Sequence, residues 1–181
     1  NVVDENCKNI DLKPQSPYAY VKLKEEKYIK RYLRNKNYLI LRLGTIYGTS
    51  PGIRFHTAVN KFCFQAALSQ PITVWKTAFN QVRPYLGVDD FNRSIMHIIR
   101  NDLVNGNTFN IVSYNLSVRD IINKIKIYKK KLKISFVNHE IMNQLSYNVL
   151  NTKFKNTKFN FKSDLEKQIK NTIELFDNAR E

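Results

Sequence analysis

The sequence predicts an α/β fold that contains a parallel sheet. Apolar segments of strand length alternate with segments of helix length along the whole chain. Residues 38–43 are almost continuously apolar, which is typical of a strand buried on both faces, as in a parallel sheet. With 181 residues, of which 43% are hydrophobic, the chain is long enough for one domain or for a domain with a smaller lobe.

The first elements can be placed from turn residues and apolar spacing. Residues 1–17 are polar, and Pro14 and Pro17 exclude a regular helix there, so this segment is predicted to be a loop. Residues 18–35 are predicted to be a helix, and the buried strand at 38–43 is followed by a glycine-punctuated loop at 44–52. The helix carries an apolar stripe that we expect to face the core: Val21, Tyr28, Ile29 and Tyr32.

The middle of the chain alternates between helices and short strands. A helix is expected at 55–68, a strand at 72–75 after Pro71, and a second strand at 84–88. Asp89 or Asp90 then has the side chain of a helix cap. The helix that would follow has an apolar face formed by Phe91, Ile95, Ile98 and Ile99.

The last third continues the same alternation. Strands are expected at 108–112 and 133–137, and Ser117 is placed to cap the helix between them. Ser163-x-x-Glu166 has the pattern of a capping box and is predicted to open a final helix. The apolar face of that helix would consist of Leu165, Ile169, Ile173 and Phe176.

Several classes of protein are disfavoured by what the sequence lacks. It has no run of 18 apolar residues, so no membrane span is expected. Cys7 and Cys63 are far apart and the three histidines do not cluster, so neither a metal site nor a disulfide is expected. Two free thiols suit a reducing compartment, and we expect a cytoplasmic protein. None of the five glycines forms a phosphate-cradling loop of the type G-x-G-x-x-G.

The formal charge of +15 leaves a second interpretation open, that of a basic nucleic-acid-binding module. Six lysines fall within residues 124–133, and Phe154, Phe159 and Phe161 alternate with lysines in a way that could stack bases beside phosphates. The chain is also rich in Lys, Asn and Ile together, a composition that AT-rich coding produces without selection for a basic surface. We therefore expect nucleic acid not to be the partner.

Tyr18 and Lys22 form the candidate catalytic pair. Residues four apart lie on the same face of a helix, one turn from each other. A lysine charge beside a phenol favours the phenolate and lowers its pKa, which makes the tyrosine a usable acid and base. The same spacing occurs at Tyr20/Lys24 and Tyr32/Lys36, so the spacing alone does not single out one pair.

Four ordered motifs give the Tyr18 pair its context. Pro14-Gln15-Ser16-Pro17 precedes Tyr18, and Leu41-Arg42-Leu43-Gly44-Thr45-Ile46-Tyr47-Gly48 ends the following strand. Arg83-Pro84-Tyr85-Leu86-Gly87-Val88-Asp89-Asp90 and then Thr108-Phe109-Asn110-Ile111-Val112 come later. The set resembles the extended short-chain dehydrogenases/reductases, the NAD-dependent nucleotide-sugar epimerases and dehydratases. In that family S-P-Y-x-x-x-K opens the catalytic helix, L-R-x-x-N-x-Y-G ends the next strand, and R-x-Y-[IL]-H-V-x-D follows.

The resemblance covers only the second half of a family member. It implies the C-terminal part of a Rossmann-like doubly wound parallel sheet, together with a smaller mixed α/β substrate-binding lobe. Residues 1–52 would belong to the NAD-binding domain with the Tyr-Lys helix. Residues 53–181 would form mainly the substrate lobe, with some segments returning to the sheet. The glycine-rich βαβ unit and a catalytic Ser or Thr would lie upstream, so we expect residues 1–181 alone to be inactive and not to bind NAD.

The resemblance also assigns roles to single residues. Tyr18 would be the acid/base and Lys22 its ribose-binding partner, with Gly44 and Thr45 beside the nicotinamide. Thr45 stands where many members have Asn, and it would contact the sugar. The remaining substrate contacts would be Val74, Trp75 and Arg83, the last clamping the diphosphate with a guanidinium fork.

Two further positions depart from the family pattern. Gly87 replaces the usual His, and the arginine that commonly precedes a Ser-Tyr pair is missing from Gln144-Leu145-Ser146-Tyr147. The family chemistry is hydride transfer to and from NAD, with NADP less expected, through a transient keto sugar. Return of the hydride epimerises the sugar, whereas elimination beforehand makes the enzyme a dehydratase. Many members pair through the Tyr-Lys helix, so a homodimer is expected.

Overall fold

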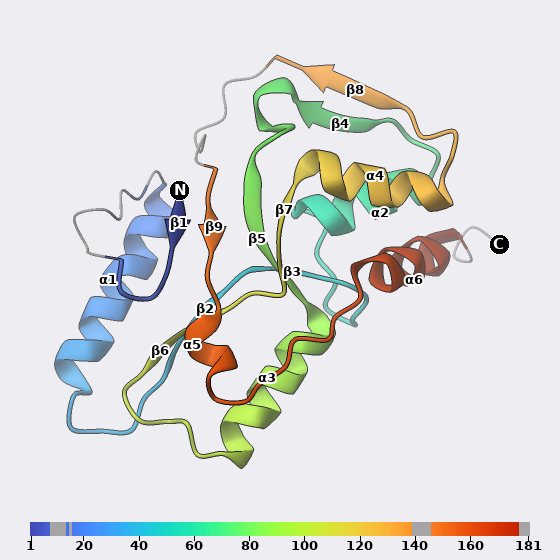
Figure 1. The fold of residues 1–181 in the computed structure, drawn as a ribbon. Helices are drawn as coiled ribbons and strands as arrows, with labels where there is room; N and C mark the ends of the chain where they lie inside the picture. Colours follow the sequence, from blue (N-terminus) through green and yellow to red (C-terminus); the bar gives the residue numbers. More distant parts are fainter. Residues whose placement is uncertain (8–13, 15, 139–145, 178–181) are drawn as a thin grey trace.

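The computed structural model describes residues 1–7, 14, 16–138 and 146–177, and it confirms the predicted α/β fold (Figure 1). The strands are β1 (Val2–Val3), β2 (Ile40–Leu43), β3 (Thr45–Tyr47), β4 (Ile72–Trp75), β5 (Val82–Gly87), β6 (Thr108–Ile111), β7 (Tyr114–Ser117), β8 (Ile134–Val137) and β9 (Asn148–Val149). The helices are α1 (Pro17–Tyr32), α2 (Ala58–Ala67), α3 (Val88–Arg100), α4 (Val118–Tyr128), α5 (Thr152–Lys155) and α6 (Leu165–Asp177), with a 3₁₀ turn at Lys76–Ala78.

The strands pair mostly in parallel. The ladders β2–β6, β3–β5, β4–β8 and β1–β9 are parallel, and among the described strands only β7 runs antiparallel, against β5. Further backbone hydrogen bonds continue the strand pairing just beyond the ends of the ladders. Gly44 N donates to Ile111 O at 3.0 Å, and Ser113 N donates to Tyr85 O at 2.8 Å. Parallel ladders joined by helices are the arrangement that the alternating sequence predicts.

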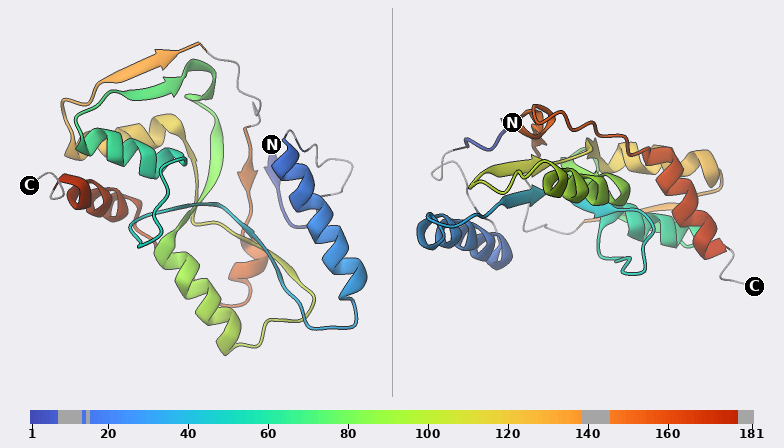
Figure 2. Two further views of the ribbon diagram at one scale, coloured as in Figure 1. Left: turned by 180° about the vertical axis from the view of Figure 1, so that it is seen from behind. Right: turned by 90° about the horizontal axis from the view of Figure 1, so that it is seen from below.

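Two hydrophobic cores lie at different places in the molecule. In the first, α2, α4 and α6 pack with β4 around Tyr47 and Tyr85. In the second, α3 and α5 pack against β6 through Ile98, Phe109 and Phe154. Segments 86–111 and 154–161 therefore share a core although they are far apart in sequence. Figure 2 shows α1 at one end of the molecule and the α2, α4 and α6 group at the other. The division at residues 52 and 53 stays a prediction.

Helix α1 packs with a different face from the one predicted. Val21, Tyr28 and Tyr32 of the expected stripe are exposed, and no residue of the helix is buried. The half-buried positions follow another line along the helix: Ala19, Leu23, Glu26 and Ile29. The prediction was correct for Ile29 and wrong for the other three positions, because the largest apolar side chains were taken to mark the inward face. In the structure, a charged residue on the half-buried line, Glu26, contacts the sheet.

Four of the described strands were not predicted, among them β1 (Val2–Val3), which lies in the expected loop at 1–17, and its partner β9 (Asn148–Val149). Residues 45–47, expected in a loop, form β3, because Thr45–Tyr47 pairs in register with Tyr85–Gly87 of β5. Residues 114–117 form β7, which pairs with Val82–Tyr85. These two strands are only three and four residues long, so their long-range pairing, rather than a local pattern, identifies them as strands. Ser117 caps α4 as predicted, in a full capping box with Asp120.

The start of α3 differs from the prediction because Asp90 has another role. The helix begins at Val88 with Gly87 as its N-cap residue, so neither aspartate caps it, and Ile99 is exposed. Asp90 is fully buried, and its two carboxylate oxygens accept four hydrogen bonds. The donors are Arg93 Nη1 at 2.7 Å, Ser113 Oγ at 2.7 Å, Lys162 N at 2.8 Å and Ser163 N at 3.0 Å. Asp90 thus ties three segments together.

The last helix is also capped by a residue other than the one predicted. Lys167 N donates to Asp164 Oδ1 at 3.1 Å, which makes Asp164 the capping side chain of α6. Ser163 is buried and directed elsewhere, with its Oγ 3.3 Å from the hydroxyl of Tyr47. The apolar face of α6 was predicted correctly at Leu165, Ile169 and Ile173, which are all buried.

Candidate functional site

The pair Tyr18 and Lys22 lies in the first two turns of α1. Ser16 starts the helix by accepting a hydrogen bond from Ala19 N at 3.2 Å, and Pro17 occupies the first helical position. The Lys22 ammonium is 5.8 Å from the centre of the Tyr18 ring. It also donates to Glu25 Oε2 at 2.8 Å, and this hydrogen bond raises the pKa of Lys22. The Tyr18 side chain is 72% exposed, so its hydroxyl is open to a ligand.

The two competing pairs are not equivalent. Lys24 lies 4.6 Å from the Tyr20 ring centre, and Tyr20 is 51% exposed, so this pair matches Tyr18/Lys22 in form. The pair Tyr32/Lys36 is not on one helix face, because α1 ends at Tyr32. Tyr20 and Lys24 therefore provide a matched comparison for any test of Tyr18 and Lys22.

An ion pair connects α1 with the sheet. Arg42 of β2 donates to both oxygens of Glu26, from Nε to Oε1 at 2.8 Å and from Nη2 to Oε2 at 2.7 Å. A bidentate pair of this kind fixes orientation as well as distance. It holds α1 against β2, and the strand runs from there to Gly44 and Thr45 at its carboxyl end (Figure 1). Ligands of open parallel sheets bind at the carboxyl ends of the strands.

Gly44 and Thr45 sit where the chain passes from β2 to β3. A Cβ atom on Gly44 would lie 2.9 Å from the carbonyl carbon of Tyr85, so a side chain would collide with the backbone of β5. Thr45 is half-buried and pairs in register with Tyr85. Arg83 lies two residues before Tyr85, so Arg83 and Thr45 share one face of this sheet.

Arg83 is held by two residues that the sequence did not assign to the site. Its Nη2 donates to Gln81 Oε1 at 3.2 Å, and its guanidinium carbon lies 5.4 Å from the centre of the Tyr147 ring. Tyr147 reaches β5 through its N–H, which donates to Val82 O at 3.2 Å, and Ser146 Oγ accepts from Val82 N at 3.0 Å. The Ser-Tyr dipeptide was the only signal in the sequence for this contact. Gln144 and Leu145 lie outside the described residues.

The other predicted substrate contacts separate into one buried and one exposed side chain. Val74 is 2% exposed and packs in the first core, whereas Trp75 is 46% exposed and points from the other face of β4. Only Trp75 therefore offers its side chain to a ligand. Thr45 and Arg83 lie on the paired strands β3 and β5, whereas Tyr18 and Lys22 lie on α1.

Gly87 has no space for the histidine that the resembled family has at this position. A Cβ atom on Gly87 would lie 1.8 Å from Ser163 Oγ and 2.6 Å from Ser163 Cβ. The space of the absent side chain is thus filled by Ser163, which is held there by Asp90 and by contact with Tyr47. This departure from the family pattern is explained by packing.

We expect Gly87→Ala to lower the free energy of unfolding by about 1–3 kcal/mol, because the added methyl group overpacks against Ser163. In a Ser163→Gly background the same substitution should cost less than about 1 kcal/mol, because the obstructing atoms are gone. Urea unfolding of the four proteins of this cycle measures the coupling. Gly52→Ala is the control, because nothing lies within 4 Å of a Cβ at that position. Simple additivity of the two substitutions would contradict the interpretation.

The features behind the nucleic-acid interpretation are partly used inside the protein. Phe154 and Phe159 are buried at 0% and 6% exposure, so they are not free to stack on bases. Lys124 pairs with Glu166, and Lys129 pairs with Asp177 at 2.7 Å, so two of the six clustered lysines bind carboxylates of α6. This arrangement does not provide the proposed stacking surface.

Other sequence expectations can be compared with the described part of the chain. None of its helices is long and apolar enough to cross a membrane. No group of three or more His, Cys, Asp or Glu residues suited to a metal ion occurs among the described residues. Cys7 and Cys63 are both free thiols, and burial raises the pKa of Cys63 to about 12.

The fold is similar to solved structures of two UDP-sugar epimerases and of RMD. UDP-glucuronic acid 4-epimerase from Bacillus cereus, in complex with UDP-glucuronic acid and NAD, matches at a TM-score of 0.84 and 21% identity, over 99% of this chain and 57% of that one. UDP-glucose 4-epimerase from Thermotoga maritima, with UDP-glucose, matches at 0.80 and 22% identity, over 93% and 56%. RMD from Pseudomonas aeruginosa, complexed with NADPH, matches at 0.78 and 16% identity, over 92% and 58%.

These matches show the fold, including the Rossmann-like arrangement that the motifs implied. The chain spans a little over half the length of the solved structures that it matches. The family model described as "NAD dependent epimerase/dehydratase family" matches residues 2–112, which include Tyr18, Lys22 and Arg83. That range is more than half of the sequence. The chain therefore belongs to the NAD-dependent epimerase/dehydratase family.

Proposed function

We propose that this chain provides the proton-transfer and substrate-binding part of an NAD-dependent epimerase or dehydratase that acts on a nucleotide-diphosphate sugar. The observation that carries the proposal is the Tyr18–Lys22 pair, exposed on a helix that Glu26 and Arg42 attach to the sheet. An exposed phenol beside an ammonium group is suited to accept and return a proton. Family membership supports the same reaction class.

The residues present fit one half of the cofactor. Lys22 has a side chain that is 55% exposed and has donors for ribose hydroxyls, and Gly44 and Thr45 directly follow the carboxyl end of β2. Tyr18, Lys22, Gly44 and Thr45 would hold the nicotinamide and its ribose. The sequence contains no glycine-rich loop for the pyrophosphate, so that half would have to be bound elsewhere. Bound NAD would supply the hydride acceptor.

Arg83, Thr45 and Trp75 are the proposed substrate contacts. The Arg83 guanidinium has a planar fork of donors that suits two phosphates, and Tyr147 and Gln81 hold it in place. Thr45 lies on the same face of the sheet as Arg83 and offers a hydroxyl to the sugar. The Bacillus cereus and Thermotoga maritima structures hold UDP-sugars, which supports a nucleotide-diphosphate sugar as the substrate here.

Proton transfer at Tyr18 would start and end the reaction. Tyr18 would accept the proton of a sugar hydroxyl while the carbon beneath gives up its hydride to bound NAD and becomes a transient ketone, with Lys22 one turn away on the same helix. Tyr18 returns the proton when the ketone is reduced. Reduction from the opposite face inverts the carbon and gives an epimer, and elimination before reduction gives a dehydrated sugar.

Two features of the whole protein belong to the same proposal. The outward side of α1, with Tyr20, Val21 and Tyr28 exposed, would pair with a second copy of the chain in a homodimer. The free thiols Cys7 and Cys63 suit the cytoplasm, which is a reducing compartment. The exposure of these apolar side chains supports the homodimer, and the free thiols support the compartment.

The proposal is tested by comparing residues 1–181 with the longest product of the same gene. Each protein is incubated with NAD and UDP-glucose or UDP-glucuronic acid, and the sugar signals are followed by NMR. We expect a new epimer or a dehydrated sugar only with a protein that contains a glycine-rich pyrophosphate loop, and no NAD binding to residues 1–181 in calorimetry. A longer product that binds NAD but converts no nucleotide sugar would contradict the proposal.

A further inference from the structure

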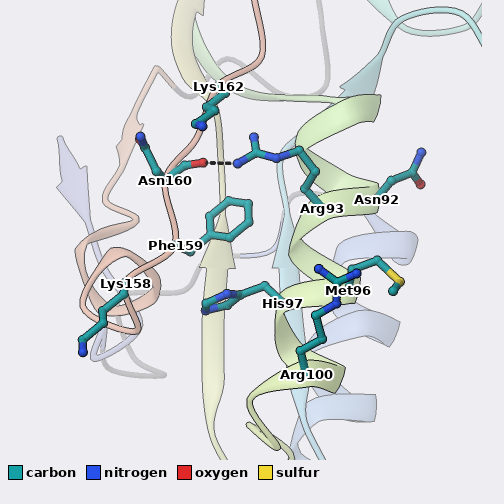
Figure 3. Close-up of a pocket in the computed structure, with 9 residues that line it drawn as sticks. All are labelled: Asn92, Arg93, Met96, His97, Arg100, Lys158, Phe159, Asn160 and Lys162. Carbon is teal, nitrogen blue, oxygen red and sulfur yellow. Dashed lines mark hydrogen bonds between the residues drawn. The ribbon is translucent and has the colours of Figure 1, made fainter.

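A basic pocket lies outside the proposed active site, between α3 and the segment that follows α5 (Figure 3). The cavity has a volume of about 550 Å³, within the range of small-molecule sites. None of its lining residues is a candidate catalytic or substrate residue. The residues that line it are Asn92, Arg93, Met96, His97, Arg100, Lys158, Phe159, Asn160 and Lys162.

The two walls of this pocket are fixed to each other at three points. Arg93 Nη2 donates to Asn160 O at 2.7 Å, as Figure 3 shows, and Asp90 Oδ1 accepts from Lys162 N at 2.8 Å. His97 Nε2 lies 3.1 Å from Thr157 O and 3.0 Å from Thr157 Oγ1. Below these contacts Phe159 is buried beneath the Arg93 guanidinium. The pocket is therefore held open by a built framework, so little ordering is required for a ligand to bind.

The lining carries four cationic side chains and no carboxylate among the residues that form it. Arg93 neutralises Asp90, but Arg100 and Lys162 make no ion pair with any other described residue. In Figure 3, Lys162 lies at one end of the pocket and Arg100 at the other, with Arg93 between them, whereas Lys158 points away from the group. Cations spread along a cavity suit an elongated anion better than a single phosphate.

We propose that this pocket binds the diphosphate group of a small phosphorylated ligand, through Arg93, Arg100 and Lys162. Arg100 offers a planar guanidinium fork and Lys162 a point charge at the far end, and Arg93 adds the N–H donors that its bonds to Asp90 and Asn160 leave over. Asn92 and Asn160 are exposed beside them and can donate further hydrogen bonds. The proposal is independent of the proposed enzymatic function, because it involves different residues and needs no turnover.

Calorimetric titration with inorganic pyrophosphate at constant ionic strength tests this site. In an Arg83→Ala background, which removes the proposed diphosphate contact of the substrate, we expect saturable binding of one pyrophosphate per chain at this pocket, with inorganic phosphate binding at least tenfold more weakly. A charge-assisted hydrogen bond contributes about tenfold in affinity, so Arg100→Ala and Lys162→Ala should each weaken pyrophosphate binding by about that factor. A UDP arm in an Arg83→Ala background shows whether a nucleotide can supply the diphosphate.

Two control variants separate a site from the general attraction of a chain with charge +15. Lys155→Ala removes one charge from the exposed side of α5, and Lys158→Gly removes one that points away from the pocket. Lys158 has a left-handed backbone with φ of 69°, so glycine is tolerated there. Both controls should change affinity less than twofold. Absence of saturable binding, or an equal loss in the controls and in Arg100→Ala, would overturn the proposal.

Discussion

Tyr18→Phe is expected to lower kcat by about 10²- to 10⁴-fold in the catalytically complete protein, with little change in KM for the nucleotide sugar. The substitution removes only the hydroxyl that would exchange the proton. The side chain is mostly exposed and makes no buried contact, so stability should not change. Steady-state kinetics with the preferred nucleotide sugar measures the effect, and urea unfolding confirms that the protein is intact.

Tyr20→Phe is the matched control for this experiment. Tyr20 lies on the same helix, is also exposed, and has Lys24 closer to its ring than Tyr18 has Lys22. If any Tyr-Lys pair on an exposed helix supported the reaction, both variants would lose activity. We expect only Tyr18→Phe to do so. Near-normal turnover in Tyr18→Phe, or an equal loss in Tyr20→Phe, would remove Tyr18 from the mechanism.

Asp90→Asn is expected to lower the free energy of unfolding by about 3–5 kcal/mol, the cost of breaking a buried ionic network. Each oxygen of Asp90 accepts two hydrogen bonds: one binds Arg93 and Lys162 N, the other Ser113 and Ser163 N. The NH2 group of asparagine would face an N–H donor in either orientation, so at least one hydrogen bond would be lost, and Arg93 would lose its charged partner. Urea unfolding followed by circular dichroism measures the change.

Asp89→Asn removes the same charge at the adjacent position and serves as its control. Asp89 is exposed and accepts one hydrogen bond, from Gln168, which the oxygen of asparagine can still accept. We expect a loss of less than about 1 kcal/mol. Equal destabilisation by the two variants would mean that net charge, rather than the buried network, determines the effect.

The sequence predicted those parts of the fold that depend on neighbouring residues. The alternation of strands and helices, the Ser117 cap and the inward face of α6 all follow from spacing within one element. The contacts of Asp90 could not be predicted, because its partners Ser113 and Lys162 lie 23 and 72 residues away. A carboxylate at the start of a helix has the appearance of a cap whether or not the fold buries it.

In the candidate site, too, the residues within local motifs could be predicted and the long-range contacts could not. Tyr18, Lys22 and Arg83 were identified from motifs, and their roles stay predictions. The contact between Arg83 and Tyr147 depends on β9 lying beside β5, which no local pattern indicates. Most of the inward face of α1 was mispredicted because the side chains were chosen by their hydrophobicity alone. The structure instead attaches this helix to the sheet through the ion pair of Glu26 and Arg42.

The contact of Gly87 with Ser163 also limits the order in which these two positions can change. A side chain added at position 87 while Ser163 is present strains the structure, because the two Cβ atoms would be 2.6 Å apart unless the chain shifts. Replacement of Ser163 by glycine removes the obstruction at the cost of its contact with Tyr47. A larger residue at position 87 is therefore accepted more readily after Ser163 has changed to glycine. The reverse order passes through a sequence that is destabilised by overpacking.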